Sequence, residues 1–176
     1  MNQRNLSIAW LATILLLSVF AGFSWQNAQL TPEAGGQSVE ITGYSAFPII
    51  SALVLLQAAS MLASFLTPVI VGRWIAGLLS LLMLGHAVLL TLTLDAGIQS
   101  SLARLLSEIT GVSGSASQIQ FVVSLDSSFL WVGYLAAVAI NVIFLVGKAL
   151  LNLKPTQKSS SVKQLDEAAD LWESQK

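Results

Sequence analysis

The 176-residue sequence contains no cysteine and a single histidine, His86. The absence of cysteine excludes disulfides, thiolate metal sites and a cysteine nucleophile. Because His86 is the only histidine, any catalytic triad or metal site built on imidazole would have to use this one position. We therefore expect no metal site and no cofactor.

Charged residues are also scarce. The chain has 8 Lys and Arg and 9 Asp and Glu, whereas a soluble domain of this length carries about 44 charged residues. So few charges cannot cover a water-facing surface, and the mean hydropathy of +0.75 likewise indicates an integral membrane protein. The net charge of −1 leaves no basic surface for phosphates, so we expect no nucleic-acid partner.

Long uncharged apolar stretches make up much of the chain. A hydrocarbon core of about 30 Å needs about 20 helical residues, and four stretches qualify: residues 6–25, 47–67, 74–94 and 129–147. Each should be a helix, because irregular backbone cannot face lipid. We predict an all-α integral membrane four-helix bundle over residues 1–153, in contact with the lipid bilayer, and a cytoplasmic tail over residues 154–176.

The basic residues predict an orientation, since Lys and Arg accumulate on the cytoplasmic side. With four spans, seven basic residues share one side and Arg104 alone lies on the other. We therefore expect a multi-pass protein of the cell membrane with both termini in the cytoplasm. The apolar run after Arg4 could also be a signal peptide, but it is longer than the usual apolar region of one, so a retained anchor is favoured.

The segments between the spans carry weaker patterns. Residues 26–43 are polar and rich in turn residues, which predicts a loop. Residues 98–109 have apolar side chains at helical spacing, which predicts an amphipathic helix in the long outer loop, with Asp95 as its cap and Gly111 at its end. We expect it to lie on the membrane surface or over the mouth of the bundle, as a lid rather than as a gate. Residues 119–125 alternate like a strand, but we identify no partner strand and expect a marginal element.

The tail predicts a short helix that places Leu165 and Trp172 among acidic residues. A helix of this length cannot bury a core alone. It could dock on a cytosolic partner or on the protein's own inner face through Leu165 and Trp172, and a solvated tail is an equal alternative.

Polar residues inside the spans are the best candidates for function, because they are costly in lipid. The candidates are Gln57, with Ser60 one turn away, His86 and Asn141. Interhelical hydrogen bonding is the commonest role of such residues; the alternative is that the four converge on a polar pocket for a small solute. No Asp, Glu, Lys or Arg lies in any span, which weakens ion-coupled pumping, and catalytic motifs are missing. We do not expect an enzyme.

Two rows of small residues recur at four-residue spacing within the third and fourth spans. The rows are Gly72, Ala76 and Ser80, and Gly133 and Ala137 leading to Asn141. Small residues let helices approach closely, so these rows should be seams between helices.

The order of features resembles a known family. Trp25 closes the first span, and a polar loop leads into Val39-Glu40-Ile41-Thr42-Gly43-Tyr44-Ser45-Ala46-Phe47-Pro48. Arg73 precedes a Gly-rich span, Trp131 opens the fourth, and the tail carries Asp170-Leu171-Trp172-Glu173. In these features the chain resembles the actinobacterial tryptophan-biosynthesis-associated membrane proteins. It departs from them in a tail that stops soon after its tryptophan and in a single arginine before the first span.

The resemblance implies a gene found beside tryptophan-synthesis genes and no established biochemical activity, so no site residues carry over. We predict a non-enzymatic accessory integral membrane protein linked to tryptophan biosynthesis, acting in small-solute transport, sensing or membrane anchoring. The alternative is a structural or assembly subunit that binds other membrane proteins through its small-residue seams. Either function allows a homo-oligomer.

Overall fold

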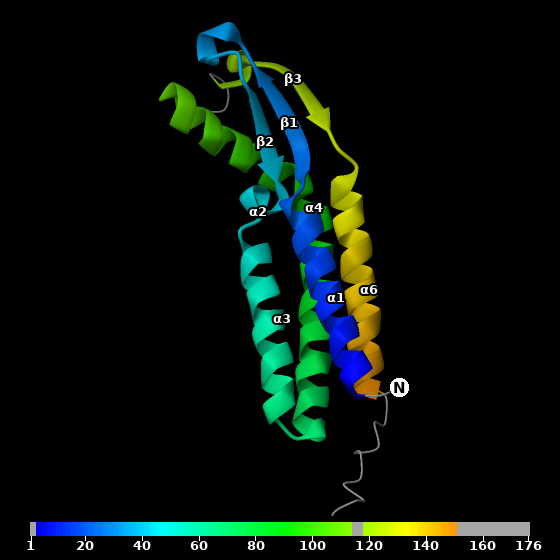
Figure 1. Cartoon of the computed structure of the whole chain (residues 1–176). Helices are drawn as coiled ribbons and strands as arrows, with labels where there is room; N and C mark the ends of the chain where they lie inside the picture. The colour runs from blue at the N-terminus through cyan, green and yellow to red at the C-terminus, as the bar shows by residue number, and fades with distance from the viewer. Residues whose placement is uncertain (1–2, 114–117, 151–176) are drawn as a thin grey trace, which may run out of the picture.

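The computed structural model describes residues 3–113 and 118–150. Four helices run side by side as a bundle: α1 (Gln3–Gly22), α3 (Ile49–Leu66), α4 (Val69–Thr110) and α6 (Leu130–Leu150) (Figure 1). Both ends of the described chain lie at the same end of the bundle, here called the terminus end (Figure 1). The predicted tail, with Leu165 and Trp172, lies outside the described residues.

Three of these helices, α3, α4 and α6, are long and apolar enough to cross a membrane. Helix α1 has a shorter apolar stretch, Ser7–Gly22. It nevertheless contributes Trp10, Leu17 and Ala21 to the buried core. Helix α1 therefore forms part of the interior of the bundle.

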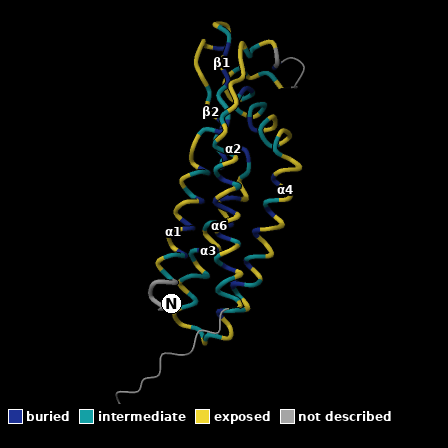
Figure 2. Tube along the Cα trace, turned by 90° about the vertical axis from the view of Figure 1, so that its right-hand side faces the viewer, coloured by how far each residue is buried: buried dark blue, intermediate teal, exposed yellow. Residues whose placement is uncertain are grey.

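The outward faces of the helices are apolar. Leu78 and Leu92 of α4 are 70% and 76% exposed, and Figure 2 shows buried residues along the inside of the bundle and exposed ones around it. In water such a surface would be a large aggregation-prone patch. It suits contact with lipid.

Helix α4 is the main departure from the predicted helix boundaries. Its 42 residues correspond to about 63 Å, roughly twice the thickness of a hydrocarbon core. The third span and the predicted amphipathic helix are therefore one continuous helix, and the expected helix start at Asp95 is wrong. The predicted end is confirmed: Gly111 has a φ of 69°, and its N–H donates to the carbonyl of Ser107 3.0 Å away.

A small sheet corrects the all-α prediction. It consists of β1 (Ser24–Leu30), β2 (Ser38–Thr42) and β3 (Val122–Ser127), antiparallel in the order β2-β1-β3. The segment predicted as a polar loop forms the β1–β2 hairpin, which turns through the short helix η1 (Pro32–Ala34) and two glycines with positive φ, Gly35 and Gly36.

The expected unpaired strand has a partner after all. β3 pairs with β1, with Ala28 opposite Leu125. Because β1 lies far away in the sequence, alternation within β3 alone could not reveal this pairing.

The sheet packs on the part of α4 beyond Leu94. Leu30, Ala34 and Leu106 are buried between them, with Leu102 and Phe121 packed alongside. The apolar face of the predicted amphipathic helix therefore packs against protein rather than against a membrane surface. We call this unit the cap; it comprises β1, β2, β3, η1, η2 (Ile119–Phe121) and α4 from Asp95 to Thr110.

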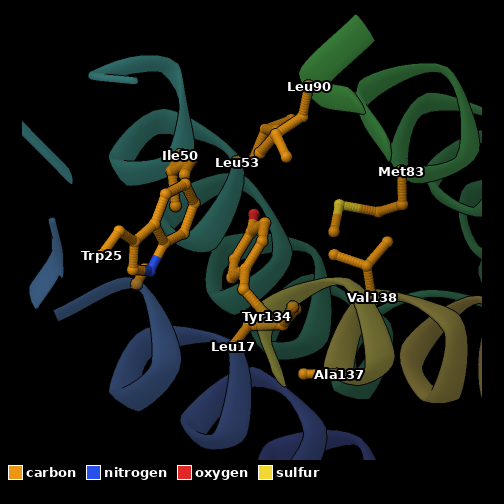
Figure 3. Close-up of a cluster of buried hydrophobic side chains, with 10 residues drawn as sticks. Leu17, Trp25, Ile50, Leu53, Met83, Leu90, Tyr134, Ala137 and Val138 are labelled. Atoms are coloured by element: carbon orange, nitrogen blue, oxygen red, sulfur yellow. The ribbon is translucent and has the colours of Figure 1, made fainter. Parts of the chain in front are cut away.

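Aromatic side chains join the cap to the bundle. The ring of Trp25 lies 5.5 Å from that of Tyr134, centroid to centroid, and its indole N–H donates to the carbonyl of Phe20 at 2.9 Å. Figure 3 shows the two rings among aliphatic side chains from several helices. Gly43, in the short helix α2 (Gly43–Ala46), lies so close that a Cβ there would be 2.5 Å from the Trp25 ring.

Candidate functional site

The most buried polar contact of the bundle joins Gln57 on α3 to Asn141 on α6. Each side-chain amide donates to the carbonyl oxygen of the other, at 3.0 Å from Gln57 and at 2.9 Å from Asn141. Gln57 is 1% exposed and Asn141 is fully buried. We call these two residues the amide pair.

A third helix joins the amide pair through Thr13 of α1. Asn141 Nδ2 also donates to Thr13 Oγ1 at 2.9 Å, and this hydroxyl donates to the carbonyl of Trp10 at 2.8 Å. Polar groups buried in an apolar interior are costly unless they are hydrogen-bonded. Here they bond to one another, so the network links three helices and leaves the amide oxygens occupied.

His86 lies elsewhere. Its Nε2 is 3.1 Å from the hydroxyl of Tyr134, and the two rings meet edge to face with centroids 6.0 Å apart. Tyr134 precedes Asn141 by about two turns of α6, or roughly 10 Å. The structure thus brings Gln57 and Asn141 together, but it places His86 in a second contact nearer the cap.

The serines near Gln57 do not extend the amide pair. Ser60 is half-buried, and the Ser64 hydroxyl donates within its own helix to the carbonyl of Met61 at 2.7 Å. Of the four residues of the predicted pocket, Gln57 and Asn141 bond to each other, His86 bonds to Tyr134, and Ser60 joins neither contact.

Sequence reasoning missed Thr13 and Tyr134, the partners of Asn141 and His86. A signal for Tyr134 was available, because positions about two turns apart share one face of a helix. Thr13 gave a weaker signal, since threonine often bonds within its own helix, as it also does here.

A basic contact lies at the terminus end of the bundle. The ammonium of Lys148 lies 3.8 Å from the centroid of the Trp10 ring, and Trp10 is fully buried. This cation–π geometry lets the lysine stem pack on the bundle while its charge stays at the helix end. Trp10, an unusual residue in the first span, is thus accounted for by packing.

The small-residue rows are used inside the molecule. Ala76 is fully buried and Ala137 is 1% exposed, and the Phe20 ring packs directly on Gly133. These rows are seams between the helices of this chain.

Hollows occur in the cap. One of about 470 Å³ runs between α4 and β3, lined by residues that include Leu102, Ala103, Leu106 and Val123. A second, of about 280 Å³, lies where the cap meets the bundle, and its lining includes Asp95, Trp25 and Trp131. Gln99, Leu102 and Leu125 line both, so the two hollows adjoin.

The two ends of the bundle carry opposite charge. At the terminus end, α1 begins with Arg4 in its first turn, α4 has Arg73 near its start, and α6 has Lys148 in its last turn. The elements of the cap carry Arg104 together with five acidic residues: Glu33, Glu40, Asp95, Glu108 and Asp126.

A bundle with three membrane-length apolar helices, lipid-compatible outer faces and a polar cap defines the class as a multi-pass membrane protein. Comparison with protein-family models, with curated proteins and with solved structures found no match to this chain.

Proposed function

We propose that this chain is a non-enzymatic accessory protein of the cell membrane that binds a small solute with its cap, while its helix bundle serves as a closed scaffold. In this proposal α1 is the fourth span, both termini lie in the cytoplasm and the cap lies outside. The basic residues support the orientation, since those of the terminus end are cytoplasmic under the positive-inside rule.

The observation that carries the proposal is the amide pair. A transport route needs polar groups that can exchange partners with a solute. Gln57 and Asn141 instead bond to each other and to Thr13, at 3.0 Å or less, whereas hollows large enough for small ligands lie in the cap. The site therefore favours binding or sensing over transport.

The alternative of an assembly subunit that binds through helix seams has less support. Ala76 and Ala137 already pack within this bundle. Anchoring through Leu165 and Trp172 and the link to tryptophan biosynthesis stay predictions.

Solute binding and transport can be separated with purified full-length protein. We expect at least one member of a panel of small solutes, including tryptophan and its precursors, to raise the Tm in nanodiscs, without solute uptake into proteoliposomes. Gln99→Trp, which fills the junction of the two hollows, should abolish the stabilisation. Ser100→Trp, at a neighbouring exposed position of α4, is the control and should retain it.

The double variant Gln57→Leu/Asn141→Leu should bind as the wild type does. If proteoliposomes with the wild type take up solute and those with the double variant do not, the proposal is contradicted and a transport role is restored. Stabilisation that survives Gln99→Trp would place the binding site outside the cap hollows.

A further inference from the structure

The hollow where the cap meets the bundle combines one carboxylate with aromatic and amide side chains. Asp95 contributes the carboxylate, Trp131 the accessible aromatic surface, and Gln26 and Gln99 the amides, while the buried Trp25 also lines the hollow. Its volume is about 280 Å³, which is close to the lower limit for small-molecule sites.

Asp95 is exposed, and no basic side chain of the described residues forms an ion pair with it. The basic residue of the cap, Arg104, lies about 13 Å further along the same helix, beyond the reach of a salt bridge. The other acidic residues of the cap make the local potential negative, which attracts cations. The charge of the site is therefore complementary to a cation.

The aromatic surface suits the same ligand. An ammonium group is attracted to the face of an indole ring, and Trp131 is only half-buried. Trp25 is fully buried and its N–H is bonded to the Phe20 carbonyl, so Trp131 supplies the accessible ring face and Trp25 forms the wall behind it. The side-chain carbonyls of Gln26 and Gln99 can accept hydrogen bonds from an ammonium.

From these observations we infer that the hollow beside Asp95 binds an ammonium group carried on an apolar body, which lies in the adjoining groove between α4 and β3. The groove is lined by Leu102, Leu106 and Val123, among others. Its α4 residues, from Gln99 to Leu106, follow Asp95 along the helix toward the end of α4 in the cap. The inference names the ligand class for the cap binding of the proposed function and rests on it.

The direction of the groove selects a soluble amine over a membrane lipid. In a phospholipid with an ethanolamine headgroup, the apolar chains extend from the ammonium into the membrane. Here the α4 residues of the apolar groove lie beyond Asp95 along the helix, on the side away from the part of α4 that packs in the bundle. The shape therefore fits an amphiphilic amine that enters from the aqueous side.

The test uses the full-length protein in phosphatidylcholine nanodiscs and two matched probes, 2-phenylethylammonium and its neutral analogue 2-phenylethanol. Calorimetry and tryptophan fluorescence measure the Kd. A charge-assisted hydrogen bond should make the amine bind about tenfold more tightly than the alcohol. Asp95→Asn should remove this preference, while Glu40→Gln, an exposed cap residue outside the hollow, should preserve it. An unchanged Tm without ligand shows that each variant is folded.

Each other outcome overturns the inference. Equal Kd values for the two probes, or a preference that persists in Asp95→Asn, would show that the carboxylate does not select the ligand. Stabilisation by phosphatidylethanolamine in the nanodisc that depends on Asp95, without binding of the soluble amine, would assign the site to a lipid. If neither probe binds while another solute of the panel does, the amine assignment fails and the proposed function stands.

Discussion

Gln57 and Asn141 form a reciprocal pair of hydrogen bonds, at 3.0 and 2.9 Å, between two helices that are far apart in sequence. The pair is fully enclosed, so its energetics depend on whether both partners are present. Removing one amide strands the other in an apolar interior, whereas removing both leaves only the Thr13 hydroxyl, which still donates to the Trp10 carbonyl.

We therefore expect Gln57→Leu and Asn141→Leu each to destabilise the protein by about 1–3 kcal/mol. The double variant should be closer to the wild type than the sum of the single effects. Unfolding in mixed micelles measures the free energies. Additive single effects would show that the two amides do not interact, in contradiction to the structure.

The two polar contacts should be energetically independent. Tyr134→Phe removes the hydroxyl bonded to His86 and should cost about 1 kcal/mol. Because Tyr134 and Gln57 share no hydrogen-bond partner, the coupling between Tyr134→Phe and Gln57→Leu should stay below about 0.5 kcal/mol. A double-mutant cycle measures it, and a coupling above about 1 kcal/mol would support the single pocket predicted from the sequence.

The junction between cap and bundle should be intolerant of added volume. In Gly43→Ala, the new Cβ would lie 2.5 and 2.7 Å from carbons of the Trp25 ring and 2.9 Å from the Ala21 carbonyl oxygen. We expect a loss of about 1–3 kcal/mol, as in other overpacked interiors, measured by thermal unfolding.

Gly85→Ala is the matched control for Gly43→Ala, because a Cβ at Gly85 would meet nothing within 4 Å. Replacing a glycine inside a helix should leave the stability unchanged or raise it by up to about 1 kcal/mol. Equal effects of the two substitutions would argue against the close packing of Gly43 on Trp25.

The sequence predicted the helices that depend on local pattern. The long uncharged apolar stretches predicted α3, α4 and α6, and the preference of glycine for helix ends predicted that α4 ends at Gly111. The prediction that a new helix starts at Asp95 was wrong, because no residue at that position ends the preceding helix. The glycine that follows, Gly97, has Phe47 packed directly against it, a contact that the sequence does not display.

The sheet and half of the site depend on contacts between distant segments. In β2, Val39 and Ile41 alternate with polar residues, a strand signal that the polar composition around it obscured. In β1, a bulge between Ser24 and Gln26 interrupts the alternation. The sequence nominated Gln57 and Asn141 by polarity alone, but only the three-dimensional arrangement could show that they meet each other and that His86 meets Tyr134.

In the proposed topology, the cap lies outside the cell while the opposite end of the bundle faces the cytoplasm. Because the sequence has no cysteine, each single-cysteine variant carries one thiol at a known position. Suitable positions are Gln37, exposed in the β1–β2 turn, and Leu66, 90% exposed where α3 ends.

This topology can be tested by labelling intact cells with a membrane-impermeant maleimide. We expect Gln37→Cys to be labelled in intact cells and Leu66→Cys to be labelled only after permeabilisation. Labelling of Leu66→Cys in intact cells, with Gln37→Cys protected until permeabilisation, would contradict it.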